Sequence, residues 1–257
     1  MEKTLGLLLL ENLPITHAGS LCNPNTFSFP TLQNAVPGAT VRTVMDGDED
    51  ILDAYIRCAR QLENDGVSAI TSNCGFTSLF QRQLAAAVKV PVALSSLSLV
   101  PFAATTVPKG KKVGILTYDA TRMGEKHFAA AGWSSAQIDV AVAGIEGSET
   151  WTRLAAQIPD LPASAIVEDV MIATRSLLKR EPDVAALVFE CAAFPLAADA
   201  VRCETGLMIA DYVGLAKMLI EVSPVRFDTA AISPRDIPGF LSLTSHWCEH
   251  VSRTILS

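Results

Sequence analysis

The 257-residue sequence predicts an α/β fold built from two similar halves, and three observations support this class. Signals for strands and helices alternate along the chain, which is typical of parallel sheets with helical crossovers. Hydrophobic residues make up 49% of the chain and aromatic residues 6%, as in a globular α/β protein rather than a disordered or fibrous one. A short apolar strand closely followed by a cysteine also recurs in each half, at Cys74 and at Cys191.

The first half begins with the apolar run Leu5 to Leu10, which we interpret as a buried strand. The run is too short to span a bilayer, and Glu11 follows it without a small-residue cleavage pattern. Apolar periodicity and turn residues then place the other elements of this half. These are a long loop at 11–38, a strand near 40–45, a helix near 49–64, a strand at 67–73, a helix at 77–88, a strand at 91–94 and a helix at 97–107.

The second half repeats this plan after a crossover in which Pro108 and Gly110 end the preceding helix. We expect residues 1–107 and 223–257 to form lobe one and residues 108–222 to form lobe two. The tail from Asp236 has the apolar spacing of one helix face and is expected to pack on a lobe. The elements expected in lobe two are a strand at 112–117, a helix near 121–131, a strand near 137–142, a helix near 163–180, a strand at 184–188, a helix, a short strand at 206–209 and a helix at 211–222.

Cys74 and Cys191 are the candidate catalytic residues, because each lies at the carboxyl end of a predicted parallel strand. Ligands bind at that edge of an open α/β sheet, where loops and helix amino-termini converge. Two lobes facing each other would therefore bring both thiols to one cleft. Cysteine is also often buried without a function, and it is the matched placement of these two that favours a functional role. We interpret Cys58, Cys203 and Cys248 as structural, and the role of Cys22 stays open.

A pair of thiols suits the inversion of a carbon acid, since a base must act on one face of the carbon and an acid on the other. We expect Cys74 and Cys191 to exchange these roles for the two enantiomers. Helices expected after both cysteines would lower the pKa of each thiol from about 8.5. Donors to a substrate carboxylate are expected nearby. They are Ser72, Asn73, Thr77, Thr117 and Thr121, together with backbone N–H groups at Gly75 and Ala192.

The loop at 11–38 is a second source of candidate substrate contacts, because long polar loops at a strand's carboxyl end are often functional. Asn12, Asn25 and Thr26 are its candidates, although turn chemistry explains Asn25 and Thr26 almost as well. Asp119 and Glu190 flank the predicted cleft. Either carboxylate would tune a thiol, but an exposed or ion-paired state is the simpler interpretation for both.

Charge and cysteine usage exclude several classes of function. The formal charge is −7, with 20 Lys plus Arg, which argues against nucleic acid or an anionic membrane as the main partner. Six cysteines without a CxxC pair or a secretory signal indicate reduced thiols and a cytoplasmic location. His246 and His250 lie four residues apart but have no evident third ligand, so no metal site is expected.

The two cysteine motifs, Ser72-Asn73-Cys74-Gly75 and Glu190-Cys191-Ala192-Ala193-Phe194-Pro195, resemble those of the aspartate/glutamate racemase superfamily. This superfamily includes glutamate, aspartate and hydantoin racemases, maleate isomerase and arylmalonate decarboxylase. The resemblance spans nearly the whole chain. It implies two pseudo-symmetric flavodoxin-like lobes with mainly parallel sheets, an active site in the cleft between them, no pyridoxal cofactor, and a dimer or larger assembly. Glutamate racemase typically has Thr-His where this chain has Ala192-Ala193, so the resemblance does not extend to a glutamate substrate.

Residues and resemblance together predict an isomerase that acts without a cofactor, a racemase or epimerase of an amino acid or a related small carboxylate. A maleate-type cis-trans isomerase would use the same thiols to add to a double bond and supply a proton. An arylmalonate-type decarboxylase would use one thiol to protonate an enolate. A two-lobed small-molecule binding protein is the alternative outside catalysis, and it predicts no unusually reactive cysteine.

Overall fold

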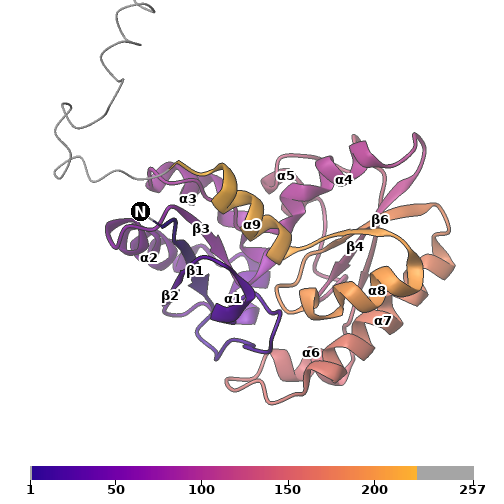
Figure 1. The fold of residues 1–257 in the computed structure, drawn as a ribbon, viewed down its shortest axis with the longest axis horizontal. Helices are drawn as coiled ribbons and strands as arrows, with labels where there is room; N and C mark the ends of the chain where they lie inside the picture. The colour runs from indigo at the N-terminus through magenta and orange to yellow at the C-terminus, as the bar shows by residue number, and fades with distance from the viewer. Residues whose placement is uncertain (1, 225–257) are drawn as a thin grey trace, which may run out of the picture. The chain divides into compact units, whose positions relative to one another are not determined.

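The computed structural model describes residues 2–224, which contain two parallel sheets of three and four strands (Figure 1). The first sheet has the order β2-β1-β3, formed by Thr31–Ala35, Leu5–Leu9 and Ala69–Ser72. The second has the order β5-β4-β6-β7, formed by Val140–Gly144, Lys112–Thr117, Val184–Phe189 and Met208–Ala210. The mixed α/β class and the parallel pairing confirm the predicted fold class.

The two sheets share a topology, which supports the pseudo-repeat. In each half the first strand is central, the second strand pairs on one side of it, and the third pairs on the other. After the second strand the chain crosses to the other side of the central strand, so the order of the strands reverses there. Ligands of open α/β sheets bind at such a switch point, at the carboxyl ends of the strands. Strands β3 and β6, which precede the two candidate cysteines, occupy equivalent positions in this order.

Helices cover both faces of each sheet, and the residues of β1 show how. Leu8 belongs to a core that includes residues of α2 (Leu52–Asn64) and α3 (Gln81–Ala87). Leu5, Leu7 and Leu9 belong to the other core, with α9 (Tyr212–Val222). Successive side chains of a strand point to opposite faces, so an all-apolar strand needs cover on both. The second sheet is covered by α7 (Ala163–Arg180) and α4 (Val100–Thr106).

Two helices pack against the sheet of the other half of the sequence. Helix α4 precedes β4 in the chain but packs on β4 and β6 (Figure 1). Helix α9 follows β7 but packs on β3. Residues 2–224 accordingly form one compact unit, and the division into lobes at residue 107 stays a prediction.

The predicted strand near 40–45 is wrong, because Val41–Asp46 forms helix α1. Thr40 caps this helix by accepting a hydrogen bond from the backbone N–H of Thr43, and Gly47 ends it in the left-handed conformation at φ 70°. The missing strand is β2, which lies inside the predicted long loop. Residues 91–94 contribute only an isolated bridge from Val92 to Ile70 rather than a strand.

The remaining predicted elements agree with the structure to within a few residues. Helix α6 (Glu149–Leu154) was not predicted, and the tail from Asp236 lies outside the described residues. No helix within residues 2–224 has the length and apolar character needed to cross a membrane. The other elements are the helices α5 (Glu125–Ala130) and α8 (Ala198–Thr205) and the short 3-10 helices Pro24–Thr26, Glu49–Ile51, Gly75–Phe80, Ser96–Leu99 and Phe194–Ala197.

Candidate active site

Cys74 is held in a tight turn between β3 and the 3-10 helix that starts at Gly75. The carbonyl oxygen of Cys74 accepts hydrogen bonds from the hydroxyl groups of Thr77, at 2.5 Å, and Ser72, at 3.0 Å. Asn73, the residue before Cys74, is held in place because its Oδ1 accepts a hydrogen bond of 2.9 Å from the backbone N–H of Leu10. The sequence Ser-Asn-Cys-Gly thus builds a turn that presents the thiol at the carboxyl edge of the first sheet.

Cys191 occupies the equivalent place in the second half. It follows Glu190 at the end of β6, and the 3-10 helix Phe194–Ala197 begins three residues later. The backbone N–H of Glu190 donates to the carbonyl of Leu116 on β4. The backbone N–H of Phe194 donates to the carbonyl of Cys191, which closes the turn.

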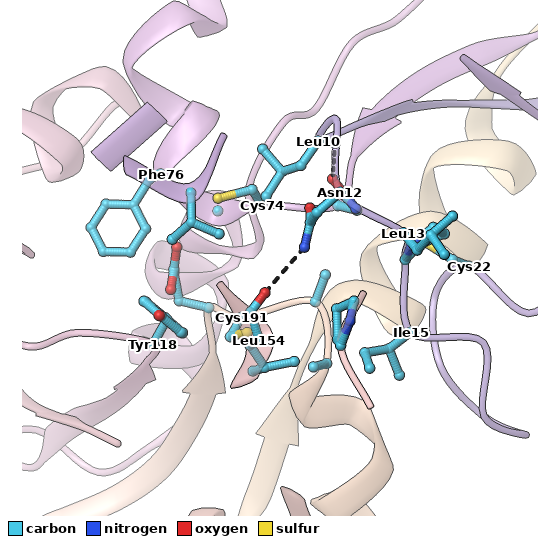
Figure 2. A pocket seen from close by; sticks show the side chains of 18 residues that line it. Leu10, Asn12, Leu13, Ile15, Cys22, Cys74, Phe76, Tyr118, Leu154 and Cys191 are labelled. Carbon is cyan, nitrogen blue, oxygen red and sulfur yellow. Dashed lines mark hydrogen bonds between the residues drawn. The ribbon is translucent and has the colours of Figure 1, made fainter. Parts of the chain in front are cut away.

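Both cysteines line one cavity (Figure 2). Figure 2 shows them on facing sides of it, with Phe76 and Tyr118 toward one end and Leu13 and Ile15 toward the other. The cavity has a volume of about 80 Å³. This is room for roughly two or three water molecules at about 30 Å³ each. Its lining consists of Leu10, Asn12, Leu13, Pro14, Ile15, Cys22, Val41, Asn73, Cys74, Gly75, Phe76, Tyr118, Leu154, Pro159, Glu190, Cys191, Ala192 and Ala193.

The loop after β1 covers this cavity by bonding to the second half. The side-chain amide of Asn12 donates to the carbonyl oxygens of Leu154 and Ala156, at 3.1 and 3.3 Å. The backbone N–H of Leu13 donates to the carbonyl of Gln157 at 3.0 Å. The Oδ1 atom of Asn12 is buried without a hydrogen-bond partner among the described residues, so it is available to a ligand.

Burial dominates the acidity of both thiols. Burial, with a smaller contribution from the charge of Glu190, raises the pKa of Cys74 to about 12 despite the lowering effect of the backbone N–H groups of Phe76 and Thr77. The pKa of Cys191 is raised by the same two causes, although the backbone N–H groups of Ala193 and Phe194 lower it. The expectation that helix amino-termini would lower both values is therefore wrong in its net direction, because desolvation outweighs the N–H groups.

Glu190 differs from the simple interpretation of its sequence position, since it is fully buried and makes no ion pair among residues 2–224. Its Oε2 accepts a hydrogen bond of 2.7 Å from the hydroxyl of Thr117, while its Oε1 has no partner among the described residues. Burial raises the pKa of this carboxyl to about 7, opposed by the hydrogen bonds from Thr117 and the backbone N–H of Tyr118. Asp119 is also buried rather than exposed, and its Oδ1 accepts hydrogen bonds from Thr121.

The predicted contact residues fall into three groups. Asn12, Asn73, Gly75 and Ala192 line the cavity with the two cysteines. Ser72, Thr77 and Thr117 are fully buried behind it, where their hydroxyls hold the Cys74 turn and Glu190. Thr121, Asn25 and Thr26 are outside the lining: their hydrogen bonds go to Asp119, Asn23 and Ser20, and for Asn25 and Thr26 this is the expected turn chemistry.

Sequence reasoning missed Tyr118, which is the most polar of the unpredicted lining residues. Its hydroxyl donates to the carbonyl of Trp151 in α6 at 2.6 Å, and burial raises the pKa of its phenol. The signal for it was its place directly after β4, equivalent to Leu10 after β1. Cys22 also lines the cavity, and burial raises the pKa of its thiol to about 12.

No group of His, Cys, Asp or Glu within residues 2–224 is arranged to hold a metal ion. His246 and His250, the pair considered for this role, lie outside the described residues, as does Cys248. All five cysteines in the described part of the chain are free thiols, with Cys203 exposed and Cys58 partly exposed.

A comparison of sequences with characterised proteins finds similarity to lyases. No protein-family model matches the chain. A dimethylsulfoniopropionate lyase of Durusdinium sp. clade D is 28% identical over 208 residues, covering 79% of this chain and 69% of that protein. Dimethylsulfoniopropionate lyase 3 of Emiliania huxleyi is 24% identical over 218 residues, covering 82% of this chain and 57% of that protein. The chain thus spans little more than half to two thirds of the length of these relatives.

Comparison with solved structures finds racemases and a decarboxylase. Allantoin racemase from Klebsiella pneumoniae matches with a TM-score of 0.54 and 18% identity, covering 85% of this chain and 86% of that one. Unliganded arylmalonate decarboxylase matches with a TM-score of 0.52 and 12% identity, covering 86% and 94%. Glutamate racemase RacE1 from Bacillus anthracis matches with a TM-score of 0.51 and 13% identity, covering 85% and 80%. The chain therefore has the fold that these racemases and arylmalonate decarboxylase share.

Proposed function

We propose that this protein is an enzyme that removes the proton next to the carboxylate of a small substrate, with Cys74 and Cys191 as its acid and base. The observation that carries the proposal is that two thiols, from equivalent positions in the two halves, face one small cavity. The cavity supplies backbone N–H groups near both sulfur atoms, and these stabilise negative charge that develops during the reaction.

Racemisation or epimerisation is the reaction that uses both thiols. One cysteine, as thiolate, takes the Cα proton, and the thiol of the other delivers a proton to the opposite face. The carbon is inverted, and the negative charge has moved from one sulfur to the other. An amino acid or a derivative of one is the substrate class predicted from sequence. No cofactor is needed for this step when the carbanion is delocalised into the substrate carboxylate.

Elimination is a second candidate, favoured by the sequence similarity to dimethylsulfoniopropionate lyases. The same proton is removed, the bond from Cβ to the leaving group breaks with its electron pair, and a carbon–carbon double bond forms. Ten lining residues are apolar: Leu10, Leu13, Pro14, Ile15, Val41, Phe76, Leu154, Pro159, Ala192 and Ala193. A dimethylsulfonio group has no hydrogen-bond donors and suits such a lining better than an ammonium group does.

Proton NMR in D2O tests the proposal on a panel of amino acids, hydantoins, malonates, maleate and dimethylsulfoniopropionate. A racemase replaces the Cα proton by deuterium and forms the other enantiomer, and a lyase produces alkene signals of the unsaturated acid. We expect Cys74→Ser and Cys191→Ser each to lower racemisation at least 100-fold, as for loss of a general acid or base. For elimination, only the variant that loses the base should be affected this strongly.

Cys203→Ser is the matched control, because Cys203 is exposed and lies outside the cavity lining. It should turn over substrate like the wild type. Full activity in both the Cys74→Ser and the Cys191→Ser variants would contradict the proposal. Consumption of maleate or malonates alone would instead assign isomerisation or decarboxylation to the same cavity.

A further inference from the structure

Glu190 is a buried acid in the wall of the cavity, and one of its two carboxyl oxygens has no hydrogen-bond partner among the described residues. It lines the cavity, yet its side chain is 0% exposed. Thr117 donates to Oε2, but Oε1 has no hydrogen-bond partner within residues 2–224. A buried carboxylate is costly unless it is paired or fully hydrogen-bonded, so this arrangement favours the neutral acid.

No described residue of the lining can balance a negative charge, because none is Lys, Arg or His. Cys74 and Cys191 in the lining, Tyr118 after β4 and Tyr212 on α9 are ionisable groups near Glu190, and each becomes negative when it loses a proton. The charge of Glu190 raises the pKa of Cys74, Cys191 and Tyr212. Each negative charge in this cavity therefore opposes the next one.

The backbone places Glu190 against both catalytic turns. It directly precedes Cys191, and its carboxyl group lies against Gly75, the residue after Cys74. A Cβ atom added at Gly75 would overlap Oε1 and the carbonyl oxygen of Glu190. The protonation state of this one carboxyl group therefore affects the sulfur atoms of both Cys74 and Cys191.

We propose that Glu190 is a charge gate: a carboxylate enters the cavity, and a thiolate forms in it, only while Glu190 carries its proton. The inference rests on the proposed function for the identity of the substrate as a carboxylate. In that reaction the substrate carboxylate and one thiolate already place two negative charges in the cavity, offset only by a cationic group that the substrate itself carries. Ionised Glu190 adds a third with no cation in the lining to offset it. Glu190 is therefore a positioning residue: it sets the charge of the cavity and is not the base that removes the substrate proton.

The gate operates near neutral pH, because burial places the pKa of Glu190 at about 7. Binding of a carboxylate raises that pKa further, so binding takes up a proton from solution above pH 7. By linkage, the apparent affinity for a carboxylate then falls up to tenfold per pH unit above the pKa.

Two alkylating reagents of nearly equal size and shape test the gate without any turnover. Iodoacetate carries a carboxylate and iodoacetamide is neutral, and both react with the same thiolate. The ratio of their rates at Cys74 and Cys191 therefore cancels the thiolate fraction and reports the charge of the cavity. Rates are measured from pH 5.5 to 8.5 by mass spectrometry of the modified peptides, with exposed Cys203 as the reference thiol in the same molecule.

In the wild type we expect the ratio of iodoacetate to iodoacetamide rates at the cavity cysteines, relative to Cys203, to fall at least fivefold between pH 6 and pH 8. Glu190→Gln, which keeps the size and an acceptor for Thr117, should remove this pH dependence. Thr117→Val should move the fall to higher pH, because the Thr117 hydrogen bond lowers the pKa of Glu190. If Glu190 and Thr117 only supported the fold, replacing them would not shift the pH midpoint of the ratio of iodoacetate to iodoacetamide rates.

A ratio that does not change with pH in the wild type would overturn the gate, as would an unchanged midpoint in Thr117→Val. The Thr117→Val measurement keeps the test decisive even when Glu190→Gln fails to fold. Because alkylation needs no substrate, a failed gate leaves the NMR test of the two cysteines intact. A failed turnover test likewise leaves the measured charge of the cavity intact.

Discussion

At the scale of single residues, Gly75 is a point of close contact between the turn that carries Cys74 and the turn that carries Cys191. Gly75 is buried and lies against the side chain and carbonyl oxygen of Glu190, with no room for a methyl group. The requirement is steric, because Gly75 does not have a positive φ. A glycine after the first cysteine is thus a packing necessity of this cavity.

Gly75→Ala should lower the free energy of unfolding by about 1–3 kcal/mol, the usual cost of overpacking a filled site. It should also slow alkylation of Cys191, since Glu190 and the turn behind it must move. Urea unfolding measures the first effect and peptide mass spectrometry the second. Gly124→Ala is the matched control, because Gly124 has extended backbone and open space around its Cα. Equal stability of the two variants would show that Gly75 is not packed in this way.

At the scale of elements, α1 is a short helix that contributes Val41 to the cavity lining and Val44 to the core. It has six residues and would not form alone, so its caps and packing must hold it. The side chains of Thr40 and Thr43 each accept a hydrogen bond from the other's backbone N–H, at 3.1 and 2.9 Å. This reciprocal pair replaces part of the hydrogen bonding that the first turn lacks.

Thr40→Ala should destabilise the protein by about 1 kcal/mol through loss of this cap. Hydrogen exchange of the α1 amides should accelerate in step, because opening of α1 exposes them. The control is Thr105→Ala: Thr105 is exposed in α4, and its hydroxyl donates only to the carbonyl of Phe102 within the same helix. Its replacement should be neutral or slightly stabilising. Equal effects of the two substitutions would mean that the Thr40 cap contributes nothing.

The region around α1 also shows why some elements were not predictable from sequence. The β-branched residues Thr40, Val41, Thr43 and Val44 favour a strand, but the capping pair and Gly47 select a helix. Strand β2 carries little apolar signal, because it is an edge strand with Leu32 37% exposed. Buried strands such as β3 and β6 were predictable, since strands covered on both faces must be apolar on both.

The candidate site likewise has a part that could be predicted from the sequence and a part that could not. The positions of Cys74 and Cys191 were predictable because each follows a buried apolar strand, and the carboxyl ends of parallel strands lie at one edge of a sheet. The cover of the cavity was not, because it depends on hydrogen bonds between segments far apart in the sequence, from Asn12 to Leu154 and from Leu13 to Gln157. The unpaired state of Glu190 depends on which groups the fold places around it, and a single sequence does not encode that directly.

At the scale of the whole molecule, exchanged helices and shared hydrogen bonds join the two halves of residues 2–224. The hydroxyl of Tyr212 on α9 donates to the carbonyl of Leu94 at 2.6 Å. The hydroxyl of Ser96 donates to the carbonyl of Phe189 at 2.7 Å, directly behind Glu190. Neither half can unfold without exposing helices that cover the other, so we expect a single cooperative transition.

Two buried groups give this transition opposing pH dependences. Burial raises the pKa of Glu190 from 4.5 to about 7, so the folded state binds more protons and stability falls as pH rises from 4.5 to 7. Burial lowers the pKa of His127 from 6.5 to about 4, so the unfolded state binds more protons and stability rises as pH rises from 4 to 6.5. Each slope approaches about 1.4 kcal/mol per pH unit, and in the wild type the two largely cancel between pH 4.5 and 6.5.

Single substitutions should reveal each slope. Relative to the wild type, Glu190→Gln should gain stability with rising pH over this range. His127→Asn, which keeps an acceptor for the backbone N–H of Gly124, should lose stability with rising pH instead. Urea unfolding at half-unit steps from pH 4.5 to 7.5 measures both difference curves, and other titrating groups cancel in the comparison. Curves parallel to the wild type would mean that neither group changes its pKa on folding. Slopes of opposite sign would show that the molecule offsets its buried acid with a buried neutral histidine, and so keeps an uncharged Glu190 without a net pH penalty.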